Sequence, residues 1–161
     1  MSNIFTSATA HDGVIVMRDV KVPMRDGVEL ATDIYLPASS AGREHETFPV
    51  IMERTPYGKH LQSRSEREPG DSEPLARSEV AAFFVRHGYA VVYQDCRGRY
   101  GSGGHFTKYT SDAEDGYDTC AWIMAQPWSN GRIGTKGLSY AAHTQAALGS
   151  VNAPGVVAMM I

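Results

Sequence analysis

The stretch Gly137-Leu138-Ser139-Tyr140-Ala141 is the part of the sequence that decides the fold. It follows an extended run at 132–136 and precedes a helix-forming run at 141–148. Small residues stand two positions before and two positions after Ser139, where larger side chains would collide with the neighbouring strand and helix. A serine on such a strand-to-helix turn is typical of a nucleophile elbow, which lifts the hydroxyl clear of the sheet.

The rest of the chain predicts the sheet that such an elbow needs. The runs 14–23 and 28–37 are rich in β-forming residues and are joined through Asp26-Gly27, which predicts an antiparallel hairpin. Alternation in the second run predicts one buried face and one solvent face. From residue 48 onward, strand and helix patterns alternate, which predicts a mostly parallel sheet with crossover helices. The fold class is therefore α/β, and the elbow makes an α/β-hydrolase fold the expectation.

Further elements follow from hydrophobic periodicity and from the start and stop signals of helices. Strands are expected at 48–52, 89–94, 132–138 and 156–161, and helices at 78–87, after 111–114, and at 140–149. The middle helix is expected to begin with a capping box at 111–114 and to bury Ala113, Tyr117, Cys120, Ala121 and Met124. The segment 59–77 is expected to be a mobile surface loop, and 96–110 a glycine-rich connection.

Composition limits the class of protein. The chain has 161 residues, of which 42% are hydrophobic and 20% charged, as in an ordinary globular domain. A net charge of −3 without a basic stripe argues against a nucleic-acid partner. No apolar run reaches the roughly 20 residues of a membrane span, and 1–13 lacks the features of a signal peptide, so we expect a cytoplasmic protein without a membrane partner. Cys96 and Cys120 form no CxxC pattern and are expected to pack as reduced thiols.

The chemistry of the elbow centres on two groups. A serine hydroxyl is a poor nucleophile at neutral pH and needs a neighbouring base, which a later loop would supply to Ser139. The backbone N–H of Tyr140 opens the following helix and points toward the place where a substrate carbonyl oxygen would become negative. The pattern predicts acyl transfer.

Four ordered motifs carry a resemblance to a known family. They lie at 22–30 (VPMRDGVEL), 54–57 (RTPY), 94–104 (QDCRGRYGSGG) and 137–140 (GLSY). In this order they resemble the CocE/NonD hydrolases, a family that includes cocaine esterases, α-amino-acid ester hydrolases, glutaryl acylases and X-prolyl dipeptidyl-peptidases. The resemblance extends from about Val14 to Ile161. It implies an α/β-hydrolase with an inserted helical cap and a C-terminal jelly-roll domain, of which 1–161 corresponds to the N-terminal portion only.

The resemblance also implies roles for individual residues. Ser139 would be the nucleophile, and the oxyanion hole would combine the N–H of Tyr140 with the hydroxyl of Tyr57 from the Arg-x-Pro-Tyr motif. The triad aspartate and histidine follow the nucleophile in this family and are expected to lie outside the chain. No cofactor and no metal are implied, since the histidines show no ligand spacing.

Other polar residues receive structural interpretations. His143 follows Ser139 by one helical turn and is expected to point away from the hydroxyl. Asp95 is expected to make structural hydrogen bonds beside the glycine-rich loop. The acidic residues at 112, 114, 115 and 118 are explained by the helix dipole.

The sequence therefore predicts the N-terminal portion of a serine hydrolase that cleaves a small-molecule ester, an amide or a short peptide. Nothing in these residues chooses among an ester, a β-lactam side chain and an X-Pro peptide. The resemblance makes a homo-oligomer a reasonable expectation. The 161 residues alone are expected to be inactive or nearly so. The alternative is a non-catalytic module of the same fold, or a pseudoenzyme, that binds a ligand or partner.

Overall fold

The structure is a computed structural model that describes residues 8–11, 13–38 and 46–161. Most of the N-terminal segment at 1–13 lies outside the described residues, as does His45. The main sheet contains β1 (Ala8–His11), β2 (Val14–Pro23), β3 (Glu29–Pro37), β4 (Phe48–Thr55), β7 (Ala90–Asp95), β8 (Ser129–Lys136) and β9 (Val156–Met160). The helices are α1 (Arg77–Arg86), α2 (Asp112–Met124) and α3 (Tyr140–Ser150).

The strand order of this seven-stranded sheet is β1-β2-β3-β7-β4-β8-β9. The pairs from β1 to β7 are antiparallel, and β7, β4, β8 and β9 run parallel to one another. The hairpin formed by β2 and β3 and the parallel remainder confirm the predicted α/β class. Because β4 and β8 are neighbours and run parallel, the segments that follow both strands emerge at the same edge of the sheet.

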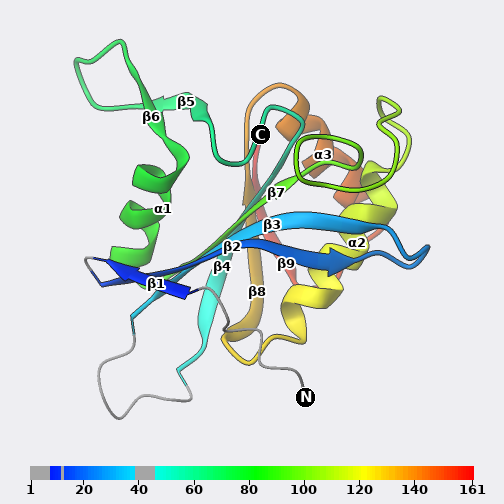
Figure 1. Ribbon diagram of the computed structural model, residues 1–161, viewed down its shortest axis with the longest axis horizontal. Coiled ribbons are helices and arrows are strands. Elements are labelled where there is room, and N and C mark those ends of the chain that lie inside the picture. The colour runs from blue at the N-terminus through cyan, green and yellow to red at the C-terminus, as the bar shows by residue number, and fades with distance from the viewer. Residues whose placement is uncertain (1–7, 12, 39–45) are drawn as a thin grey trace.

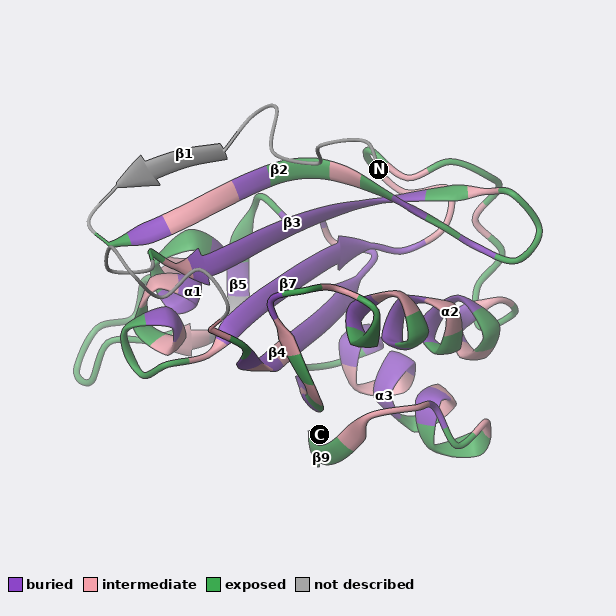
Figure 2. Ribbon diagram, turned by 90° about the horizontal axis from the view of Figure 1, so that it is seen from below, coloured by how far each residue is buried: buried purple, intermediate pink, exposed green. Residues whose placement is uncertain are grey.

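Helices cover both faces of the sheet, with α1 on one side and α2 and α3 on the other (Figure 1). Alternate residues of β7 show the two layers, since Val91 and Tyr93 pack with α1 whereas Ala90 and Val92 join the core beneath α2 and α3. The central strands are buried almost throughout (Figure 2). This packing fixes the two strand ends that carry the site.

The predicted solvent face of β3 is wrong, because both faces of this strand are buried from Leu30 to Leu36. Asp33 is the clearest case, with a side chain that is 0% exposed. Its carboxylate accepts hydrogen bonds from Arg18 Nη1 at 2.8 Å and pairs with Lys59 Nζ at 2.9 Å. Tyr35 packs beneath α1. In β3, the alternation of polar and apolar residues therefore separates two buried faces, one of which contains polar side chains. It does not separate a core face from a solvent-exposed face.

The buried face predicted for α2 is wrong except at Cys120, which is fully buried as expected. The residues that it buries are Asp112, Asp115, Gly116, Thr119, Cys120 and Ile123. Tyr117 and Met124, which we expected inside, are exposed. The predicted capping box is absent, since Ser111 makes no side-chain capping bond. The polar face turns inward because buried polar side chains of β4 and β7 lie beneath it and accept or donate its hydrogen bonds.

The segment 59–77 is more ordered than a surface loop. It contains β5 (Gln62–Arg67) and β6 (Pro74–Ala76), which pair as a separate two-stranded sheet. Lys59 and Arg77, at its two ends, are buried. The charged residues of this segment therefore include some that form buried ion pairs, in addition to those that face solvent.

The strand β9 forms one edge of the sheet, and most of its residues are exposed (Figure 2). The exposed side chains include those of Val157, Met159 and Met160. Within the described residues, none of the helices has both the length and the apolar character needed to cross a membrane.

Candidate active site

Ser139 lies at the sharp turn between β8 and α3. Its backbone has φ 63° and ψ −119°, a region that non-glycine residues rarely occupy and that often accompanies a functional turn. The side chain is exposed, and the hydroxyl makes no capping bond to the helix that follows. The predicted strand-to-helix turn at this serine is confirmed.

The residues on either side of the turn must be small because they contact each other. A Cβ atom placed on Gly137 would lie 2.5 Å from the Cβ of Ala141, and the φ of Gly137 is +143°. Atoms at that separation overlap, so neither position accepts a larger side chain without opening the turn. Small residues are therefore required at both positions, as expected. The reason is that residues 137 and 141 would collide with each other, and not with the neighbouring strand and helix.

Tyr57 reaches Ser139 from the neighbouring strand. It follows the end of β4, and its phenolic oxygen Oη lies 3.0 Å from Ser139 Oγ. The backbone N–H of Tyr140 donates to the same phenolic oxygen over 3.4 Å. The structure thus brings together all three residues singled out in the sequence, from the ends of two adjacent parallel strands.

The segment that carries Tyr57 is clamped by a buried arginine at the start of α1. The guanidinium of Arg77 donates to three carbonyl oxygens of this segment, those of Gly58 (3.1 Å), Leu61 (3.1 Å) and Gln62 (2.8 Å). The carbonyls of an irregular segment need such donors when they are buried. Arg77 therefore restricts the backbone that places the phenol.

The carboxylate of Glu53 connects Arg77 to β8, the strand that precedes the elbow. Glu53 Oε1 accepts from Arg77 Nη2 at 2.8 Å, and Glu53 Oε2 accepts from Lys136 Nζ at 3.1 Å. The three side chains are at most 5% exposed. Removal of one partner would leave buried charge without compensation, which usually destabilises a protein strongly. Lys136 is the last residue of β8. The ion pairs of Glu53 therefore connect the segment that carries Tyr57 with the strand that precedes Ser139.

His143 and Asp95 are engaged away from the serine hydroxyl. The Nε2 atom of His143 lies 3.4 Å from Asp112 Oδ2, and its ring packs edge-on against Tyr109. Asp95 accepts hydrogen bonds from the backbone N–H groups of Lys59 (2.8 Å) and Gly101 (3.3 Å). Both residues have the structural contacts that the sequence predicted.

The carboxylates of α2 do more than complement a helix dipole. Asp115 pairs with Arg97 Nη2, and Asp118 Oδ1 accepts from Arg25 Nη2 at 2.7 Å. Asp112 accepts from the phenol of Tyr140, a contact that the sequence reasoning missed. The signal that could have revealed it is the i, i+3, i+6 spacing of these carboxylates, which places all three on one face of the helix.

Neither cysteine has the properties of a nucleophile, and the described residues contain no cluster suited to a metal ion. Cys96 and Cys120 are buried free thiols, and burial raises the pKa of each to about 12. A thiol with such a pKa carries almost no thiolate at neutral pH. Across 8–11, 13–38 and 46–161, no three His, Cys, Asp or Glu side chains are grouped so that they could hold a metal ion.

Comparison with known proteins places the chain among hydrolases. Residues 26–161 match the family described as X-Pro dipeptidyl-peptidase (S15 family). A cocaine esterase from Rhodococcus sp. (strain MB1 Bresler) is 40% identical over 131 residues, which cover 81% of this chain. The match covers 20% of the esterase, so the chain spans about a fifth of the length of this relative.

Solved structures give the same answer for the fold. A CocE/NonD family hydrolase from Staphylococcus aureus superimposes with a TM-score of 0.73 and 34% identity, covering 91% of this chain and 27% of that chain. An α-amino acid ester hydrolase superimposes with a TM-score of 0.71 and 31% identity, covering 98% of this chain and 27% of that chain. The α/β-hydrolase fold predicted from the elbow is confirmed.

Proposed function

Because the chain belongs to the X-Pro dipeptidyl-peptidase (S15) family, we propose that it forms the N-terminal part of a serine hydrolase. In this proposal Ser139 is the nucleophile that accepts an acyl group. The hydroxyl of Tyr57 and the backbone N–H of Tyr140 are the two donors of the oxyanion hole. The general base and its acid partner are assigned to no residue of this chain, since in the fold they follow the nucleophile.

One observation carries the proposal: the Tyr57 hydroxyl lies within hydrogen-bonding distance of both the Ser139 hydroxyl and the Tyr140 backbone N–H, although they follow different strands. The distances are 3.0 Å from Tyr57 Oη to Ser139 Oγ and 3.4 Å from Tyr140 N to Tyr57 Oη. A carbonyl oxygen placed between the phenol and the amide could accept from both. Donors fixed in advance around a developing negative charge stabilise the transition state without reorganisation, and each contributes about 3 kcal/mol.

The reaction would proceed in two steps. Ser139 Oγ attacks the carbonyl carbon of the substrate, the carbonyl electron pair moves onto the oxygen, and the base takes the hydroxyl proton. The tetrahedral adduct then expels the alcohol or amine, which receives that proton, and leaves an acyl-serine. Water attacks the acyl-serine by the same route, releasing the acid and restoring the hydroxyl. The relatives support a small ester, an amide or an X-Pro peptide as substrate.

The test is a nucleophile substitution in the full-length protein, with 4-nitrophenyl acetate as a general ester probe. Ser139→Ala should abolish turnover above the uncatalysed rate. Ser150→Ala, at the far end of the same helix and exposed, is the matched control and should retain full activity. Turnover by Ser139→Ala at the wild-type rate would exclude Ser139 as the nucleophile, whereas a folded wild-type protein without any turnover would favour a binding module of the same fold.

A further inference from the structure

Asp112 is a buried carboxylate that points from the first turn of α2 toward the residue after the nucleophile. Its Oδ2 atom accepts a hydrogen bond of 2.7 Å from the phenol of Tyr140, and it lies 3.4 Å from His143 Nε2. The side chain of Asp112 is 8% exposed. A carboxylate so removed from water has a large desolvation cost, which these partners offset.

The ring of Tyr140 is held on more than one side. It stacks on Tyr109 with ring centroids 5.1 Å apart and 13° between the planes. The backbone N–H of Tyr109 donates to the Tyr140 hydroxyl at 2.9 Å, so this hydroxyl accepts one bond and donates another, to Asp112. Burial, reinforced by the bond to Asp112, raises the pKa of the phenol. The phenol therefore keeps the proton that it donates.

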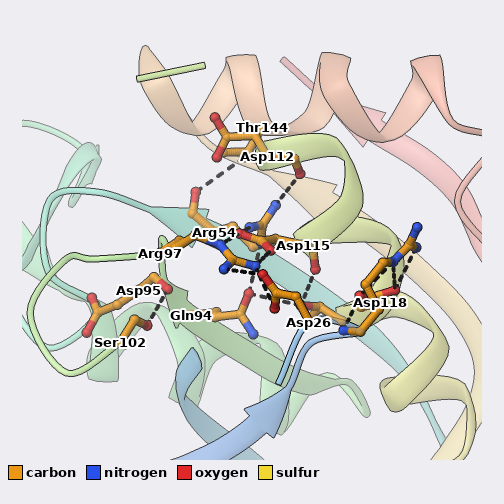
Figure 3. Close-up of polar contacts among 12 residues, drawn as sticks. Asp26, Arg54, Gln94, Asp95, Arg97, Ser102, Asp112, Asp115, Asp118 and Thr144 are labelled. Carbon is orange, nitrogen blue, oxygen red and sulfur yellow. Dashed lines mark hydrogen bonds and ion pairs between the residues drawn. The ribbon is translucent and has the colours of Figure 1, made fainter. Parts of the chain in front are cut away.

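A buried arginine connects Asp112 to the strand that leads to Tyr57. Arg54, in β4, is three residues before Tyr57 and is 2% exposed. Its Nη1 donates to the Asp112 carbonyl oxygen at 2.7 Å, and its Nε donates to Gln94 Oε1 at 2.9 Å (Figure 3). Its own carbonyl oxygen accepts from the hydroxyl of Thr144 in α3 at 3.3 Å. Arg54 thus contacts both helices that flank the site.

The close approach of α2 to this arginine depends on a glycine. A Cβ atom on Gly116 would lie 2.9 Å from Arg54 Nη1 and 2.5 Å from Leu148 Cδ2 of α3. A larger residue at position 116 would have to displace the Leu148 side chain or the guanidinium that holds the Asp112 carbonyl. The beginnings of α2 and α3 are therefore held at fixed positions against β4.

From these contacts we propose that Asp112 is a positioning residue for the oxyanion hole. It anchors the Tyr140 side chain so that the backbone N–H of Tyr140 keeps its place beside the Tyr57 hydroxyl, while Arg54 fixes Asp112 against the strand that carries Tyr57. The inference rests on the proposed function, since it assumes that these two donors act on the substrate. Small displacements of such groups are costly, and an error of about 1 Å can reduce a rate by about 100-fold.

The first test compares Asp112→Ala, Asp112→Asn and Tyr140→Phe in the full-length protein, with 4-nitrophenyl acetate as substrate. Active sites are counted from the nitrophenol burst, so that unfolded molecules do not enter kcat. Asp112→Ala should lower kcat about tenfold, with little change in KM. Asp112→Asn keeps an oxygen acceptor for the phenol and should recover most of that loss. Glu114→Ala, an exposed carboxylate in the same helical turn, should behave like wild type.

The second test is a double-mutant cycle. If Asp112 acts through the Tyr140 hydroxyl, Tyr140→Phe should lower kcat as much as Asp112→Ala does, and the double variant should be no slower than either single variant. A wild-type kcat per active site in Asp112→Ala would overturn the inference and leave Asp112 with a purely structural role. If Asp112→Ala does not fold, a wild-type kcat in Tyr140→Phe would overturn it equally.

The two proposals fail in different ways. Turnover by Ser139→Ala would remove the proposed function and with it this inference. Loss of turnover in Ser139→Ala combined with unchanged kcat in the Asp112 and Tyr140 variants would remove only the positioning role.

Discussion

Tyr57 Oη lies 3.0 Å from Ser139 Oγ, although 81 residues separate the two along the chain and each follows a different strand. The parallel pairing of β4 with β8 produces this contact, because it brings the carboxyl ends of both strands to one edge of the sheet. A phenol and a helix-opening amide that converge beside a serine hydroxyl form the chemical basis of the proposed acyl transfer.

Replacement of Tyr57 by phenylalanine should remove one donor and leave the packing of the ring intact. We expect kcat of the full-length protein to fall by about 10²–10³, with a much smaller change in KM, because the phenol stabilises the transition state more than the bound substrate. Tyr89→Phe is the matched control, since Tyr89 precedes β7 at the opposite end of the parallel strands. Equal kcat for both variants in a steady-state ester assay would argue against the donor role.

Gly137→Ala should open the elbow. The added Cβ would lie 2.5 Å from the Ala141 Cβ in a backbone with φ +143°, and the clash should destabilise the protein by about 1–3 kcal/mol. The control is Gly149→Ala in α3, the helix that follows the elbow, where a Cβ would approach only Met159 Cε, at 3.9 Å. That change should be neutral or stabilising. Thermal unfolding should give a lower melting temperature for Gly137→Ala than for Gly149→Ala. Equal melting temperatures would show that the turn does not require glycine at position 137.

Asp19 provides a pH test of the β2–β3 hairpin. The hydrogen bond from Lys59 Nζ lowers the pKa of the Asp19 carboxyl. A lowered folded-state pKa stabilises the fold above the unfolded value of about 4, and this stabilisation disappears as the pH falls through the folded-state pKa. Because the Asp19 side chain is 63% exposed, water screens the pair and its contribution should be only about 0.5 kcal/mol.

Asp19→Asn is a suitable probe because residue 19 has φ 54° at an irregular point of the β2–β3 pairing, and asparagine tolerates that backbone. Denaturant titrations should show a less stable variant at pH 6 and a difference between variant and wild type that shrinks as the pH falls below about 4. A difference that stays constant across this range would show that the charge of Asp19 does not contribute.

The order of the main helices and strands could be predicted from the sequence, because most of the parallel strands contain short apolar runs and the elbow has a characteristic sequence pattern. The strands β1, β5 and β6 were not predicted. Ser139, Tyr57 and Tyr140 could also be named in advance, from one turn pattern and four ordered motifs. The structure then placed these three residues within hydrogen-bonding reach of one another.

The predictions were wrong where polar groups are buried. The inner face of α2 was assigned from its apolar residues, yet Asp115 and Thr119 point inward toward Arg54 and Gln94. The buried side chain of Asp112 is directed toward the Tyr140 hydroxyl. Hydrophobic periodicity assigns the apolar face of a helix to the core. Because a buried arginine lies beneath α2, a polar face of this helix points toward the sheet instead. The partners of Asp112 come from distant segments of the chain, and no local pattern specifies such pairings.

The most direct test of the central claim is covalent labelling of the full-length protein with a fluorophosphonate, followed by mass spectrometry of the peptide that contains Ser139. An activated serine hydroxyl displaces fluoride and forms a stable phosphonyl ester, whereas an ordinary serine does not react. One adduct per chain is expected, located on Ser139 and absent from Ser139→Ala. A folded protein that remains unlabelled, or that is labelled equally after this substitution, would contradict the assignment of Ser139 as the nucleophile.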